Sequence, residues 1–220
     1  MGTDARSGPE AASGGQPSEW DRLHAEHQWS TEPDPLLVEL AGALEPGKAL
    51  DLGCGGGRNA LWLARQGWDV TGIDGSAVGL ARAREQARGQ ALEVEWVQAD
   101  MLEYQLPGGA YDLVVMANLH FETAVLARVL ELATDALPPG GHLFLVGHHL
   151  DNLGHHGPQA ADRLYTAERI SAVLPARLEV ERLERRERLG GSDLDQRHDI
   201  SLLVWATAGP PIEPAVPANS

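Results

Sequence analysis

The chain has 220 residues, which is enough for one α/β domain with a sizeable core and too few for two full domains. Its 17 basic and 32 acidic side chains give a net charge of −15, so we expect no binding to nucleic acid or to an anionic membrane. No apolar run approaches the roughly 20 residues of a membrane span, and the N-terminus lacks a signal-peptide pattern. The single cysteine, Cys54, permits no intrachain disulfide, and we expect a cytoplasmic protein.

The two ends of the chain differ in composition from the part between them. Residues 1–18 are rich in Gly, Ser, Pro and Ala, and residues 209–220 contain four prolines. Neither segment has an apolar period, so we predict disordered tails on both sides of one domain over residues 19–208.

In the predicted domain, helical patterns alternate with apolar runs that are typical of strands. The segment over residues 19–45 has two stretches with helical spacing, and further helices are predicted at 58–66, 76–90, 123–136 and 165–174. Strands are predicted at 48–52, 69–73, 92–98, 111–116 and 142–146, followed by an antiparallel hairpin of 178–183 and 199–206. The pattern predicts an α/β fold with a mostly parallel sheet covered by helices on both faces.

The first predicted strand leads into a glycine-rich turn, Asp51 to Gly57. Glycine permits positive φ angles and lets a ligand approach the backbone at Gly53 and Gly55. A tight strand–helix connection without any ligand uses the same residue types, so the loop by itself is weak evidence for binding. We interpret Cys54 within this loop as a small buried side chain and not as a nucleophile.

Acidic residues follow the second and third predicted strands. Asp74 comes 23 residues after Asp51, where a carboxylate can accept hydrogen bonds from both hydroxyls of a ribose; the alternative is a solvated strand end. Asp100 can accept a hydrogen bond from an adenine amine, with Met101 and Leu102 against the ring. Together these placements predict bound adenosine.

The sequence from Asp51 to Gly57 resembles the (Asp/Glu)-x-Gly-x-Gly-x-Gly loop of class I S-adenosylmethionine-dependent methyltransferases. Asp74 and Asp100 fall where that family places its ribose and adenine contacts, and the resemblance covers residues 49–146. The string LDLGCGGGRNALWLA followed by VTGID looks like the small-molecule branch that includes tellurite-resistance and thiopurine-type methyltransferases. The resemblance implies a Rossmann-like, seven-stranded sheet of order 3-2-1-4-5-7-6 with the last strand antiparallel.

The same resemblance implies S-adenosylmethionine as the cofactor and S-adenosylhomocysteine as the product. Arg58 can pair with the carboxylate of the methionine tail or lie on the outer helix surface. In the resembling families a segment before the first strand closes over the ligand, which would make Trp29 a lid residue; packing against the sheet edge is the alternative. We expect the cofactor to contact Asp51, Gly53, Cys54, Gly55, Arg58, Asp74, Gly75, Ser76, Asp100, Met101, Leu102, Asn118 and Trp29.

Candidate acceptor residues follow the fourth and fifth predicted strands, on the same edge of the sheet. The first group contains Asn118 and His120, and residues 147–157 hold four of the nine histidines. His120, His148 or His149 can accept a proton from a methyl acceptor, and solvated loop histidines are the alternative. We expect no metal site, because no ordered spacing with cysteine or carboxylate ligands accompanies these histidines.

We therefore predict a methyltransferase that acts on an oxygen, nitrogen or sulfur atom of a small molecule by in-line displacement, as a monomer or homodimer. A nicotinamide-dependent oxidoreductase is the first alternative, although the last position of its Gly-x-Gly-x-x-Gly fingerprint is occupied here by Arg58. The second alternative is a non-catalytic protein of the same fold that binds a cofactor or a metal.

Overall fold

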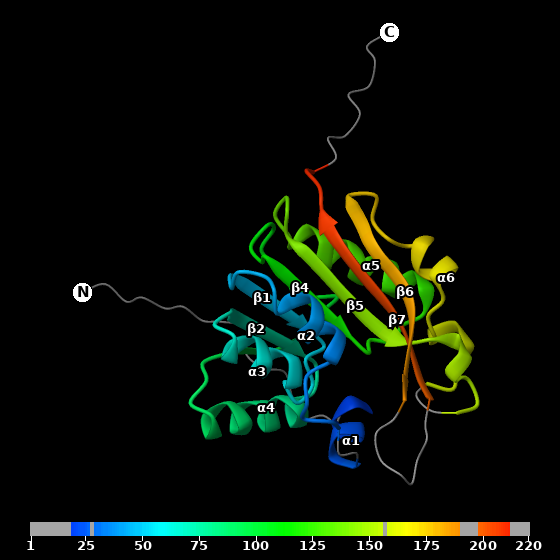
Figure 1. Ribbon diagram of the computed structural model, residues 1–220. Coiled ribbons are helices and arrows are strands. Elements are labelled where there is room, and N and C mark those ends of the chain that lie inside the picture. The colour runs from blue at the N-terminus through cyan, green and yellow to red at the C-terminus, as the bar shows by residue number, and fades with distance from the viewer. Residues whose placement is uncertain (1–18, 27–28, 156–157, 190–197, 212–220) are drawn as a thin grey trace.

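The computed structural model describes residues 19–26, 29–155, 158–189 and 198–211. One sheet contains the strands in the order β3-β2-β1-β4-β5-β7-β6, where β1 to β5 are parallel and β7 is antiparallel to both of its neighbours. The predicted fold class and strand order are confirmed (Figure 1). The strands are β1 (Lys48–Leu52), β2 (Asp69–Asp74), β3 (Glu95–Gln98), β4 (Leu113–Ala117), β5 (His142–His148), β6 (Leu178–Leu189) and β7 (His198–Ala208).

Side chains of the central strands alternate between two apolar cores, one on each face of the sheet. Leu50 of β1 and Val114 of β4 belong to one core, whereas Ala49 and Leu113 belong to the other. This period of two buries both faces of the central strands, as a parallel sheet requires. The first core is covered by α5 (Thr123–Asp135) and α6 (Ala167–Ser171), and the second by α2 (Pro35–Ala41) and α3 (Arg58–Arg65).

The segment over residues 19–45 divides into two helices with different surroundings. In α2, Leu36 and Leu37 are buried in the second core, so this helix packs against the sheet. By contrast, α1 (Glu19–Glu26) lies against α4 (Ala77–Gly89), where Asp21 Oδ1 accepts hydrogen bonds from Ser76 Oγ at 2.7 Å and Val78 N at 3.1 Å. The helical spacing in the sequence predicted both helices. It did not show that α2 packs against the sheet whereas α1 packs against α4.

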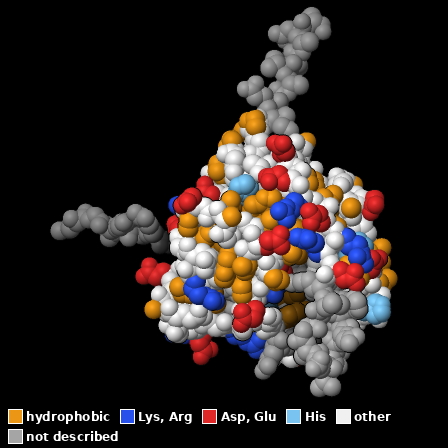
Figure 2. Space-filling model, in the orientation of Figure 1, with side chains coloured by type: hydrophobic (Ala, Val, Ile, Leu, Met, Phe, Trp, Pro, Cys, Tyr) orange, Lys and Arg blue, Asp and Glu red, His pale blue; other side chains and the backbone are white. Residues whose placement is uncertain are grey.

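The hairpin strands β6 and β7 are longer than predicted. Their pairing runs from Leu178 opposite Ala208 to Leu189 opposite His198, with a bulge near Val180. Alternating acidic and basic residues on β6 suit an edge strand, because exposed charges disfavour pairing with another sheet. Figure 2 shows acidic and basic side chains intermixed on the face of the molecule that carries this hairpin.

Two other predicted elements are shorter in the structure. The predicted helix over residues 165–174 is limited to α6, because Tyr165 is fully buried and its backbone forms a bridge with His149. The predicted strand over residues 92–98 is limited to β3, which pairs only with β2 among the described strands. Two short 3₁₀ turns, Leu150–Asn152 and Ala161–Arg163, follow β5.

The predicted tails fall almost entirely outside the described residues. Residues 1–18 and 212–220 belong to that part of the chain. At the start of the second predicted tail, Gly209 is held by the domain, because its carbonyl accepts a hydrogen bond from Arg177 Nε at 2.8 Å. None of the described helices is long and apolar enough to cross a membrane.

Candidate active site

The glycine loop after β1 folds back onto the neighbouring strand. Gly53 N and Cys54 N both donate to the carbonyl of Ile73, at 2.8 and 3.1 Å. The loop needs glycine at Gly57, where φ is 82° and an added Cβ would lie 2.6 Å from the ring of Trp96. Cys54 is buried, which raises the pKa of its thiol, as expected for a packing residue and not for a nucleophile.

Asp74, at the end of β2, joins the glycine loop to α4. Its Oδ2 accepts a hydrogen bond from Gly55 N at 2.8 Å, and its Oδ1 accepts one from Ser76 N at 2.7 Å. These two bonds fix the carboxylate plane, and each oxygen keeps a further lone pair for a ligand. The solvated strand end considered for Asp74 is not what the structure shows, since the residue is 9% exposed.

A cavity of about 1230 Å³ lies along the carboxyl ends of the parallel strands, where ligands bind in open α/β sheets. It is bordered by the glycine loop, by the ends of β2, β4 and β5, and by Trp20, His24 and residues 29–31. The structure brings twelve of the predicted site residues together in its lining: Trp29, Gly53, Cys54, Gly55, Arg58, Asp74, Gly75, Asp100, Met101, Leu102, Asn118 and His148.

Two predicted cofactor contacts are not in the lining of this cavity. Asp51 lies behind the loop, where its Oδ2 accepts a hydrogen bond from Ala60 N at 3.1 Å at the start of α3. Burial raises the pKa of Asp51 to about 7. Ser76 caps α4, because its Oγ accepts a hydrogen bond from Gly79 N at 3.0 Å. Both residues support the loop and helix that border the cavity.

The three candidate catalytic histidines have different surroundings, and His148 alone among them lines the cavity. His120 has both ring nitrogens engaged: Nδ1 donates to Arg163 O at 3.0 Å, and Nε2 accepts from His148 N at 3.4 Å. Burial lowers the pKa of His120 to about 4. His149 uses Nδ1 to accept a hydrogen bond from Asp151 N at 3.1 Å. The structure thus separates three residues that the sequence treats alike.

Leu119 and Phe121, which line the cavity, are held through their carbonyls by one side chain that precedes α6 and one within it. The hydroxyl of Tyr165 donates to Leu119 O, and Arg169 Nη2 donates to Phe121 O at 2.6 Å. Arg169 also donates to Leu164 O at 2.6 Å. No local sequence pattern marks this role, because the contacts join residues far apart in the chain.

Several residues that line the cavity were not predicted from the sequence. His24 is the clearest case: its ring is buried against Gly55, where an added Cβ would lie 3.0 Å from Cε1, and this burial lowers its pKa. The four-residue spacing of Trp20 and His24 on a helix was an available signal. The missed residues are Trp20, His24, Ser30, Thr31, Gly56, Arg82, Gln86, Gln98, Ala99, Ala117, Leu119 and Phe121.

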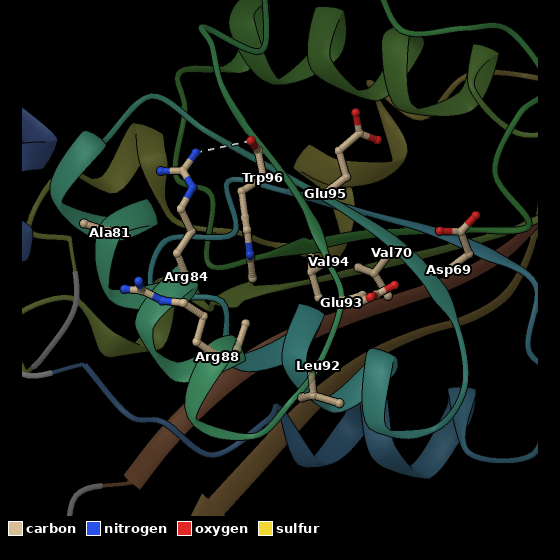
Figure 3. Close-up of a pocket in the computed structure, with 11 residues that line it drawn as sticks. Asp69, Val70, Ala81, Arg84, Arg88, Leu92, Glu93, Val94, Glu95 and Trp96 are labelled. Atoms are coloured by element: carbon tan, nitrogen blue, oxygen red, sulfur yellow. Dashed lines mark hydrogen bonds between the residues drawn. The ribbon is translucent and has the colours of Figure 1, made fainter.

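A second hollow of about 640 Å³ lies between α4 and β3, away from the predicted site residues. Figure 3 shows Arg84 and Arg88 projecting from the helix beside Trp96, and Arg84 Nη2 donates to Trp96 O at 3.3 Å. Asp69, Glu93 and Glu95 also line it. Among the described residues, no group of three or more His, Cys, Asp or Glu side chains is placed to hold a metal ion.

The chain is also similar in sequence to known proteins. Residues 49–141 match the family model described as "Methyltransferase domain". The ubiquinone biosynthesis O-methyltransferase of Cronobacter sakazakii is 37% identical over 109 residues, which cover 49% of this chain and 45% of that protein. The chain spans about half the length of the curated relatives it matches.

Solved structures show the same fold. The structure described as "Conversion of a Disulfide Bond into a Thioacetal Group during Echinomycin Biosynthesis" has a TM-score of 0.71 at 21% identity, covering 86% of this chain and 91% of that chain. TehB from Haemophilus influenzae has a TM-score of 0.66 at 20% identity, covering 80% and 62%. The chain therefore contains a region, residues 49–141, that matches a methyltransferase domain, and it shares its fold with these solved structures.

Proposed function

We propose that this protein transfers a methyl group from S-adenosylmethionine to an oxygen atom of a small molecule. The observation that carries the proposal is one cavity lined by both the Asp74 carboxylate and His148. These residues end β2 and β5, and β1 and β4 lie between them in the sheet. That span provides room for a nucleoside on one side and an acceptor on the other.

The cofactor side of the cavity fits an adenosine that carries a methionine tail. Asp74 presents a carboxylate already fixed by two backbone N–H groups, which suits a pair of ribose hydroxyls. Met101 and Leu102 are half-buried next to Asp100 and offer apolar contact to the adenine ring. Arg58 lines the cavity at the start of α3 and is our candidate for pairing with the methionine carboxylate.

The chain contributes to the reaction mainly by alignment. When bound, S-adenosylmethionine supplies an electrophilic methyl carbon on a sulfonium sulfur. An apolar or aromatic acceptor would be oriented by four apolar side chains that line the cavity: Leu119, Phe121 and the exposed Trp20 and Trp29. Holding the acceptor in line with the methyl carbon is worth several kcal/mol, about 7–11 in favourable intramolecular systems.

The oxygen acceptor is favoured over nitrogen and sulfur because the curated relative from Cronobacter is an O-methyltransferase. The net charge of −15 favours a small molecule over nucleic acid as the partner. We place the protein in the cytoplasm, as a monomer or homodimer.

Calorimetric titration with S-adenosylhomocysteine tests the cofactor site. The native protein should bind it with micromolar affinity, and Asp74→Ala should weaken binding by about 30-fold or more, because it removes charge-assisted hydrogen bonds. Asp69→Ala at the opposite, exposed end of β2 is the matched control and should bind as the native protein does. Equal affinity of the two variants would contradict the proposed ribose site.

Thermal stabilisation by different cofactors separates this function from the oxidoreductase alternative. S-adenosylhomocysteine should raise the melting temperature and NADPH should leave it unchanged. The reverse pattern would overturn the proposal. Methyl transfer is then detected as a mass gain of about 14 daltons on a phenol supplied as the acceptor.

A further inference from the structure

Asn152, buried next to β7, has a side-chain amide that is held in one orientation. Its Nδ2 donates to Ile200 O at 2.5 Å, and its Oδ1 accepts a hydrogen bond from Ile200 N at 3.2 Å. If the amide oxygen and nitrogen were exchanged, the amide N–H₂ would face the backbone N–H of Ile200, and the amide oxygen would face its carbonyl oxygen. Neither hydrogen bond could then form. The backbone of β7 therefore fixes which end of this amide carries the protons.

The same Nδ2 also lies 3.5 Å from Nδ1 of His148. An amide nitrogen donates and does not accept, so Nδ1 of His148 is the acceptor in this contact. In a neutral imidazole the remaining proton then resides on Nε2. Asn152 thus selects the Nε2–H tautomer of the histidine that lines the cavity.

His120 holds the ring of His148 from the other side. The two rings are stacked, with centroids 5.2 Å apart and planes 16° from parallel. Because His120 Nδ1 donates to Arg163 O, its Nε2 is unprotonated and accepts the backbone N–H of His148. Both the plane and the backbone of His148 are therefore set by neighbours that do not line the cavity.

Resting on the proposed function, we propose that His148 acts as a hydrogen-bond donor to the acceptor oxygen through Nε2–H, and not as the base that deprotonates it. The acceptor hydroxyl loses its proton to solvent before transfer. A lone pair of the resulting oxyanion forms the O–C bond as the C–S bond breaks, and the sulfonium becomes a neutral thioether. The substrate class is thus a hydroxyl acidic enough to ionise in water, such as a phenol or enol, and not an aliphatic alcohol.

Nitrogen NMR of the ¹⁵N-labelled full chain, without any ligand, tests the tautomer directly. We expect Nε2 of His148 to carry the bonded proton and Nδ1 to show the shift of an unprotonated nitrogen. A proton on Nδ1 would overturn the proposal. This measurement does not depend on methyl transfer, so it is decided separately from the proposed function.

Two substitutions test the role of the donor. His148→Gln keeps an amide donor near the place of Nε2–H but cannot take up a proton at neutral pH, whereas His148→Leu removes both abilities. With a phenol acceptor such as catechol, kcat/KM should fall less than about tenfold in the Gln variant and about 100-fold in the Leu variant. 1-Hexanol should not be methylated by any of the three proteins.

A general base would give a different pattern, because both variants would then lose about 100-fold or more. Such equal losses would overturn the proposal, as would methylation of 1-hexanol. Affinity for S-adenosylhomocysteine, measured in parallel, should be the same in both variants and shows that the cofactor site is intact. No methylation of any phenol by the native protein would contradict the proposed function itself, and the NMR result would still decide the tautomer.

Discussion

The two sides of the cavity are built by different means. On the cofactor side, Asp74 is fixed by backbone N–H groups 19 and 2 residues away in the chain. On the acceptor side, the carbonyls of Leu119 and Phe121 are held by the side chains of Tyr165 and Arg169, which lie 46 and 48 residues away in the chain. The first side depends on strand ends and main chain, whereas the second depends on a few distant side chains. Single substitutions can therefore reshape the acceptor wall without disturbing the cofactor loop.

We expect the largest change in the free energy of unfolding from a substitution at Asp51, behind the glycine loop. The pKa of about 7 in the folded protein lies above the ordinary pKa of an aspartate, about 3.9, so the stability that protonation provides is present below pH 4 and is lost as pH rises to 7. Asp51→Asn stays neutral and keeps an acceptor for Ala60 N. We expect it to exceed the native protein by about 2–4 kcal/mol in free energy of unfolding at pH 8, and by much less at pH 5.

Urea unfolding at the two pH values measures this difference. Asp69→Asn, at an exposed acidic position on the same strand as Asp74, is the control for loss of a carboxylate and should leave the free energy of unfolding nearly unchanged. A gap between Asp51→Asn and the native protein that is equal at pH 5 and pH 8 would show that burial of this carboxyl carries no electrostatic cost.

The acceptor side should respond to loss of Arg169. Arg169→Ala removes hydrogen bonds to Leu164 O and Phe121 O, and we expect a loss of about 2 kcal/mol in stability and about tenfold in kcat/KM for the acceptor. Affinity for S-adenosylhomocysteine should change less than twofold. Arg163→Ala, on an exposed residue with a 3.8 Å contact to Glu122, should leave all three quantities nearly unchanged. A parallel fall in cofactor affinity would show that the two sides are coupled.

We expect the smallest change in stability from a substitution that relieves the backbone conformation of Asn118. Asn118 has a φ of 59°, a left-handed conformation that is unfavourable for a residue with a side chain. Asn118→Gly should raise stability by about 0.5–1 kcal/mol while losing acceptor turnover. Ala91→Gly, at a φ of 53° on an exposed turn, should give a similar gain without loss of activity. Unchanged turnover in Asn118→Gly would show that the carboxamide has no role.

The ends of the predicted strands were the best guide to which residues lie at the cavity. Asp74, Asp100 and Asn118 follow predicted strands, and the topology alone places them at one edge, where all three line the cavity. Residues whose positions were predicted less well form hydrogen bonds with residues far away in the chain. His120 follows β4 much as His148 ends β5, but its Nδ1 is engaged by a carbonyl 43 residues away.

The helices show the same limit. Apolar spacing predicted a helix around Leu36, yet only the folded chain reveals that its apolar face enters the core instead of covering the cavity. Tyr165 was placed in a predicted helix, whereas in the structure it precedes α6 and its hydroxyl donates a hydrogen bond to Leu119 O. The apolar period of a sequence indicates which face of a helix or strand is apolar. It does not indicate which part of the protein packs against that face.

A crystal structure of the chain with S-adenosylhomocysteine tests the central claim most directly. We predict that the ribose hydroxyls bind the carboxylate of Asp74, that the adenine lies beside Met101, and that the thioether sulfur is directed toward His148. A nucleoside in the hollow between α4 and β3, or a ribose that makes no contact with Asp74, would contradict the account.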